Sequence, residues 1–130
     1  MKKILLLLSL LICTLSYAQD WKLIFEADDV AYYYKPNTEN TAWIKSVSDK
    51  TEYYPTRTSK TSKYVDGYRL TLWKFDCYSK QIGLIQVNVY SKEGKLMSKM
   101  SEQEYLVDLE YVTPDSIGEG FYSAFCLKEE

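Results

Sequence analysis

The chain of 130 residues contains no histidine. A Ser–His or Cys–His nucleophile pair and a histidine-based zinc site are therefore excluded, and with them most common hydrolase designs. The sequence also lacks a Ser-x-x-Lys motif and a glycine-rich phosphate-binding loop. Asp28 and Asp29 are adjacent acids, but neighbours in an extended segment point to opposite sides. We expect no catalytic residue, no metal site, no cofactor and no enzymatic activity.

Cysteine is scarce as well, because the chain has three in all. Cys13 lies in an N-terminal apolar run, Cys77 ends an aromatic run typical of a strand, and Cys126 ends a short segment typical of a helix. Two thiols delivered to an oxidising compartment favour a structural disulfide. We predict a bond between Cys77 and Cys126 that fastens a C-terminal helix to a sheet and stabilises the fold by roughly 4 kcal/mol.

The N-terminus has the pattern of a cleaved export signal. Lys2 and Lys3 precede an apolar run over residues 4–13, and the small residues Ser16 and Ala18 occupy the two positions that a signal peptidase reads. Cleavage is therefore expected after Ala18. The protein is predicted to be exported, with a periplasmic, secreted or surface-associated location.

This pattern divides the chain into a signal peptide, residues 1–18, and a single domain, residues 19–130. A transmembrane anchor is the first alternative, but it needs about 20 consecutive apolar residues, and the run stops at Thr14. Acylation of Cys13 is the second alternative, although Ile12 precedes it where a lipoprotein signal has a small residue. We expect no transmembrane anchor after cleavage.

The formal net charge of -2 argues against nucleic acid as a partner. Residues 43–100 carry eleven Lys or Arg against five Asp or Glu, whereas residues 101–130 carry eight acids and Lys128 as their one basic residue. The two regions either complement each other within the molecule or are separate solvated faces. The sharper alternative is that the basic region forms a strip for an anionic partner.

Short aromatic or alternating runs predict strands at residues 21–25, 30–34, 43–47, 68–77, 82–90 and 95–100. The last two are joined by a turn whose Gly94 can take a positive φ. Residues 105–112 are either another strand or the approach to the helix. We predict an α+β fold, with a mainly antiparallel sheet of about five to six strands and one C-terminal helix packed on it.

The C-terminal helix has the clearest local signals. Ser116 and Glu119 form a capping box, in which the hydroxyl accepts from the amide of residue 119 and the carboxylate reaches back to the cap amide. The expected apolar face consists of Ile117, Phe121, Ala124 and Phe125. Gly118 and Gly120 each weaken the helix by about 1 kcal/mol relative to Ala.

Residues 48–63 are rich in Ser, Thr and Lys and predict either a long exposed loop or an irregular edge hairpin. This segment and its neighbours mix aromatic and basic side chains with few acids, which suits a protein or polyanion surface. The candidate partner-binding residues are Tyr53, Tyr54, Arg57, Lys60, Lys63 and Tyr64. Alternatively, these tyrosines pack on the sheet.

Three consecutive tyrosines, Tyr32, Tyr33 and Tyr34, must place rings on both sides of any strand. Most aromatic side chains of this chain suit a half-buried sheet surface. At least one ring of the triplet is nevertheless expected to meet solvent or a partner.

Several features occur in a characteristic order: Trp21, a Tyr-rich strand ending near Lys35, the triplet 43–45, an aromatic strand ending at Asp76 and Cys77, the hairpin 89–94, the segment 112–119 and finally Phe125 and Cys126. Their order resembles the surface-adhesin protein E family of small bacterial envelope proteins. The resemblance implies an antiparallel sheet with a C-terminal helix, a Cys77–Cys126 bridge, adhesion to host extracellular matrix proteins and a homodimer.

The sequence therefore predicts a non-enzymatic binding or adhesion module that recognises a protein or matrix partner. One alternative is a structural envelope protein that associates with itself. The other is a carrier of a small ligand, which would need an apolar groove under the helix.

Overall fold

A computed structural model describes residues 21–127. The predicted signal peptide 1–18, its cleavage site and Cys13 lie outside the described residues. The elements are β1 (Lys22–Ala27), β2 (Val30–Pro36), β3 (Thr41–Tyr53), β4 (Lys63–Asp76), β5 (Gln81–Ser91), β6 (Leu96–Ser101), the 3-10 helix η1 (Glu104–Leu106), β7 (Glu110–Tyr111) and α2 (Ile117–Cys126).

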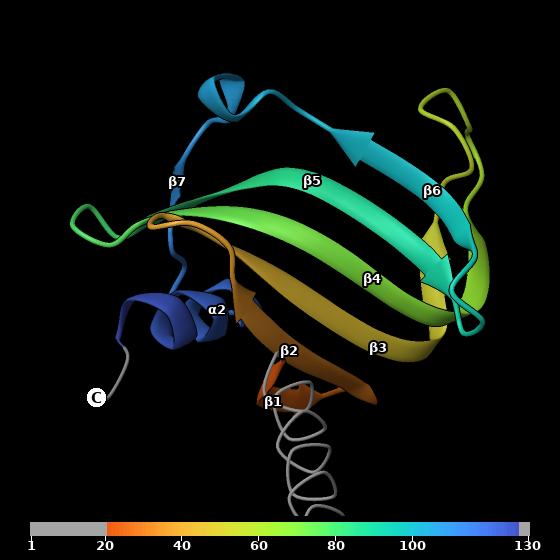
Figure 1. The fold of residues 1–130 in the computed structure, drawn as a ribbon, viewed down its shortest axis with the longest axis horizontal. Helices are drawn as coiled ribbons and strands as arrows, with labels where there is room; N and C mark the ends of the chain where they lie inside the picture. Colours follow the sequence, from red (N-terminus) through yellow and green to blue (C-terminus); the bar gives the residue numbers. More distant parts are fainter. Residues whose placement is uncertain (1–20, 128–130) are drawn as a thin grey trace, which may run out of the picture.

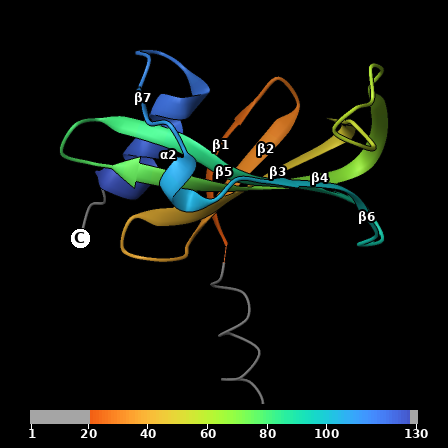
Figure 2. The same ribbon diagram turned by 90° about the horizontal axis from the view of Figure 1, so that it is seen from above.

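The strands form one antiparallel sheet in the order β1-β2-β3-β4-β5-β6, so every strand on this path pairs with its neighbours in the sequence (Figure 1). Strand β7 has only two residues and pairs with the start of β5. Helix α2 contacts β1, β2 and β4 and lies at one end of the sheet (Figure 2). The predicted fold class, an antiparallel sheet with one C-terminal helix, is confirmed.

The longest strands are β3 and β4, which form a hairpin at the centre of the sheet. Strand pairing continues to Tyr53 and Lys63, so the segment 48–63 is a hairpin, as the second alternative predicts, and residues 54–62 form the loop at its end. It extends from central strands and not from an edge. A bulge between Ser48 and Thr51 interrupts the pairing. This extra length breaks the alternation of apolar residues, which is why the strands were not evident from the sequence pattern.

The helix begins at the predicted cap. Ser116 is the N-cap residue of α2, and its Oγ accepts a hydrogen bond from the backbone N–H of Glu119 at 3.2 Å. The same hydroxyl donates to the Thr113 carbonyl at 2.6 Å. These two hydrogen bonds fix the direction in which the chain enters the first turn of α2.

The core is a cluster of aromatic rings between α2 and the sheet. Phe121 is buried and packs against Tyr32 and Trp73, with ring centroids 5.5 and 5.8 Å apart. Phe125 stacks on Phe75 at 4.4 Å. These rings occupy the space under the helix, where a carrier would need an open apolar groove.

Cys77 and Cys126 form the predicted disulfide, with their Cα atoms 5.5 Å apart. The bond joins the end of α2 to the turn after β4, across a sequence separation of 49. Tyr122 adds a second tie at the same place, because its hydroxyl donates to the Cys77 carbonyl at 2.9 Å. The C-terminal end of the helix is therefore held by one covalent bond and one hydrogen bond.

Candidate functional site

The six candidate partner-binding residues lie together at the free end of the β3–β4 hairpin. Tyr64 is 65% exposed and Tyr54 is 44% exposed. Arg57, Lys60 and Lys63 are also exposed, while Tyr53 is half-buried. The alternative in which all of the tyrosines pack on the sheet therefore does not describe this hairpin.

Hydrogen bonds between residues close in sequence order the loop at the end of the hairpin. The Thr56 backbone N–H donates to Ser59 Oγ at 3.1 Å, and the Ser59 backbone N–H donates to the Thr56 carbonyl at 3.2 Å. Arg57 Nη2 donates to the Ser101 carbonyl at 2.9 Å and so links the turn to the end of β6. These bonds order an exposed segment before any partner arrives, which lowers the entropic cost of binding.

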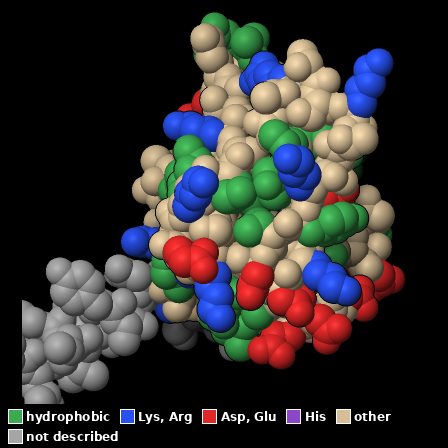
Figure 3. All heavy atoms as spheres, turned by 90° about the vertical axis from the view of Figure 1, so that its right-hand side faces the viewer, with side chains coloured by type: hydrophobic (Ala, Val, Ile, Leu, Met, Phe, Trp, Pro, Cys, Tyr) green, Lys and Arg blue, Asp and Glu red, His purple; other side chains and the backbone are tan. Residues whose placement is uncertain are grey.

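Figure 3 views the molecule from the hairpin end. Lys and Arg side chains are spread among hydrophobic and polar ones over the upper part of this view, and Asp and Glu side chains gather in its lower part. The hairpin end is thus electrostatically polarised rather than uniformly charged. A partner approaching this end would be oriented by the two regions of opposite sign.

A shallow trough of about 380 Å³ separates the hairpin from the start of α2. Tyr64, Lys50 and Arg69 line its hairpin side, and Trp73 lies at its helix side. The Trp73 Nε1 donates to Thr71 Oγ1 at 2.9 Å, and Arg69 donates to the Glu52 carbonyl. The trough extends the candidate surface from the hairpin toward the helix and adds two further cations to it.

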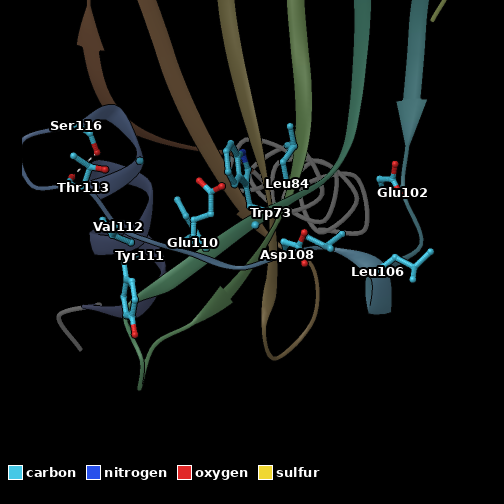
Figure 4. A pocket seen from close by; sticks show the side chains of 14 residues that line it. Trp73, Leu84, Glu102, Leu106, Asp108, Glu110, Tyr111, Val112, Thr113 and Ser116 are labelled. Carbon is cyan, nitrogen blue, oxygen red and sulfur yellow. Dashed lines mark hydrogen bonds between the residues drawn. The ribbon is translucent and has the colours of Figure 1, made fainter.

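A larger groove of about 630 Å³ lies beside the first turn of α2 (Figure 4). Its floor includes Trp73 and Leu84, and its rim carries the carboxylates of Glu102, Asp108 and Glu110. An acidic rim above an aromatic floor favours a cationic group over a neutral apolar one. This groove is beside the helix and not under it, so it differs from the groove that the carrier alternative requires.

The tyrosine triplet places its rings on both sides of β2. Tyr32 and Tyr34 belong to the aromatic core. Tyr33 pairs with Lys45 of β3 on the opposite, helix-free face of the sheet, where it is half-buried. One exposed ring was expected from the sequence, but this face was not recognised there as a surface. The sequence does contain evidence for this second surface, because apolar residues occupy both alternating sets of positions in β2, β3 and β4.

One carboxyl group has a perturbed pKa. The Ser79 backbone N–H donates to Asp76 Oδ1 at 3.1 Å and lowers the pKa of Asp76 below its ordinary value. The side chain of Ser79 acts in the same direction. Asp76 precedes Cys77, so its charge stabilises the turn that carries the disulfide.

Within residues 21–127, no group of three or more Cys, Asp or Glu side chains is arranged to hold a metal ion. The same part of the chain contains no helix of the length and apolarity needed to cross a membrane.

A family model described as surface-adhesin protein E matches residues 21–127. No curated protein and no solved structure matches the chain. The match spans every described strand and α2, including both cysteines of the disulfide. The chain therefore belongs to the surface-adhesin protein E family.

Proposed function

We propose that this protein is an exported, non-enzymatic adhesion module that binds a protein of the extracellular matrix through the end of its β3–β4 hairpin. Membership of the surface-adhesin protein E family supports a surface adhesion-type role. The observation that carries the choice of site is the group of exposed aromatic and basic side chains on an ordered hairpin.

The composition of the hairpin suits protein recognition. Tyrosine presents a large, stiff surface whose ordering costs little entropy, and Tyr54 and Tyr64 project from the end of the sheet. Exposed Lys60 and Lys63 increase the rate at which an acidic partner associates, because opposite charges steer the encounter. Binding should therefore weaken as salt concentration rises.

The export signal and domain boundaries belong to the same proposal. Residues 1–18 are removed as a signal peptide, and residues 19–130 form a single domain. The length of the family match, residues 21–127, supports these boundaries.

The test compares two variants of the mature chain. The hairpin variant carries Tyr54→Ser, Tyr64→Ser, Lys60→Gln and Lys63→Gln and leaves the Arg57 link intact. The control removes two other exposed tyrosines and two other lysines, namely Tyr105→Ser, Tyr111→Ser, Lys92→Gln and Lys95→Gln. Tyr105 and Tyr111 are 78% and 76% exposed, against 44% and 65% for Tyr54 and Tyr64, so the control loses equal charge and no less exposed aromatic surface.

Binding to a panel of immobilised matrix proteins is measured together with thermal stability and mass in solution. We expect the hairpin variant to keep its thermal stability and to bind at least about tenfold more weakly, with the control unchanged. Equal binding by both variants would disprove the hairpin as the site. A native chain that binds no matrix protein, and whose self-association is lost in the hairpin variant, would establish the structural alternative instead.

A further inference from the structure

The helix-free face of the sheet has a composition unlike that of the core face. Cross-strand partners share a face, and one row across it consists of Tyr33, Lys45, Leu70, Asn88 and Lys99. The row thus brings ring, cation and amide groups together across five neighbouring strands. We name the surface built on this row and on the rows at either side of it the lysine–ring face.

The two flanking rows repeat the pattern. On one side, Lys35 pairs with Trp43, which pairs with Leu72, and Gln86 follows on β5. On the other side, Tyr68 and Tyr90 are cross-strand partners whose stacked rings have centroids 5.1 Å apart. The side chains named in these rows are half-buried, apart from buried Asn88 and exposed Lys99. The rings of this surface are thus only partly accessible, and Tyr68 and Tyr90 turn one face toward each other.

Two lysines of this face, Lys35 and Lys45, lie against its rings. Lys45 Nζ is 4.7 Å from the ring centre of Tyr68 and 5.7 Å from that of Trp21. Lys35 Nζ is 6.0 Å from the ring centre of Trp21. A cation–π contact holds an ammonium group in place without cancelling its charge. Positive charge is consequently fixed in the middle of an aromatic surface.

Amide groups complete the surface. Gln86 Nε2 donates to Asn88 Oδ1 at 3.1 Å, and Asn88 Nδ2 donates to the Tyr90 hydroxyl at 3.3 Å. These hydrogen bonds connect three side chains of β5, the strand next to β6. Buried Asn88 holds its two neighbours in place, and half-buried Gln86 is the amide that a ligand hydroxyl can reach.

We propose that the lysine–ring face binds an anionic polysaccharide, a chain of pyranose sugars that carry carboxylate or sulfate groups. The C–H faces of such sugars pack on the half-buried rings, their hydroxyls match the amide of Gln86, and their acidic groups pair with Lys45 and Lys99. The rings, the amide and the ammonium groups of the surface then each have a matching group on the same repeating ligand. The lysine–ring face shares no residue with the hairpin site, and either site can fail without the other.

A membrane surface fits this face less well. Inserting the face into a bilayer would bury the amide of Gln86 and the ammonium groups of Lys45 and Lys99 among acyl chains, where polar and charged groups without partners are costly. A folded protein partner binds best to well-exposed aromatic anchors, whereas Tyr33 and Trp43 are half-buried here. The sugar chain is favoured because it can lie along a shallow twisted surface.

The test uses heparin and alginate as anionic polysaccharides, with dextran as the neutral control polymer. The variant Lys45→Gln with Lys99→Gln removes two charges from the face. The matched control, Lys92→Gln with Lys95→Gln, removes two charges from the β5–β6 turn. A third variant, Tyr33→Leu, removes a ring and keeps an apolar side chain of similar position.

We expect the native chain to bind heparin or alginate and not dextran, and the face variant to bind about tenfold more weakly, with the turn control close to native. Tyr33→Leu should weaken binding without changing its dependence on salt, because a ring and not a charge is lost. Equal loss in both lysine variants would mean unspecific ion exchange and would overturn the proposal. Tighter, Lys45-dependent binding to vesicles of phosphatidylcholine and phosphatidylglycerol would overturn it in favour of a membrane.

Discussion

Replacing Gly120 by alanine would test how closely α2 packs on β1. Without tertiary contacts the change should stabilise the helix by about 1 kcal/mol. In the structure, however, a Cβ at position 120 would lie 2.4 Å from Phe25 Cε1. The Phe25 ring is in turn packed against Tyr32, with centroids 4.9 Å apart, so it cannot retreat freely.

Forcing an extra methyl group into a packed core costs about 1–3 kcal/mol. The gain in helix propensity offsets part of this cost, so we expect Gly120→Ala to lower the free energy of unfolding by about 1 kcal/mol. Gly118→Ala is the matched control in the same helix. Its nearest new contact would be Ile82 Cδ1 at 3.1 Å, the flexible end of a side chain, so it should gain roughly 0.5–1 kcal/mol.

Both variants are unfolded in urea with the disulfide intact, and their midpoints are compared with that of the native chain. A difference of about 2 kcal/mol between them would correspond to roughly 8 °C or more in melting temperature. Adding Phe25→Leu to Gly120→Ala should recover part of the lost stability, because it removes the ring with which the new methyl group would clash. Equal stabilisation by the two alanines would refute the packing described between α2 and β1.

Three further predictions concern the disulfide, its turn and export. Replacing Cys77 and Cys126 by Ser should cost about 4 kcal/mol in denaturant unfolding, and a loss below about 1 kcal/mol would contradict the role of a staple. The lowered pKa of Asp76 means that its charge stabilises the fold above an unfolded pKa of about 4 and that this stability is lost as pH falls through the folded pKa. Asp76→Asn should therefore make the free energy of unfolding, measured in urea at a series of pH values, fall less at acidic pH. An unchanged decrease at acidic pH would show that the hydrogen bond from Ser79 is not formed in solution. Mass spectrometry of the exported protein should find Gln19 as the first residue, and an intact or lipidated N-terminus would contradict cleavage there.

The strands that were predictable are those with a regular apolar pattern. Residues 82–90 alternate and correspond to β5, and the turn at Gly94 has the expected positive φ of 89°. The far halves of β3 and β4 were not evident, because the bulge at Ser48 shifts the alternation and polar side chains cover both sides of the hairpin. Local composition indicates exposure there, but it does not decide between a loop and a hairpin or show that the hairpin extends from central strands.

The candidate surfaces differ in the same way. The hairpin residues are close in sequence, so their aromatic and basic character could be recognised without a structure. The lysine–ring face combines residues from five strands, and only the register shows that Lys45, Asn88 and Lys99 share a row. A one-residue shift in that register would send the same side chains into the core.

The consecutive order of the strands has a consequence for how the protein folds. Each hairpin from β1 to β6 can assemble as soon as its own two strands have emerged, because no strand waits for a distant neighbour. The helix is different, since it contacts β1 and β2 and comes from the far end of the chain. The first strands in the chain are thus the last to have their apolar side covered, because Phe25 and Tyr32 remain exposed until Phe121 packs on them.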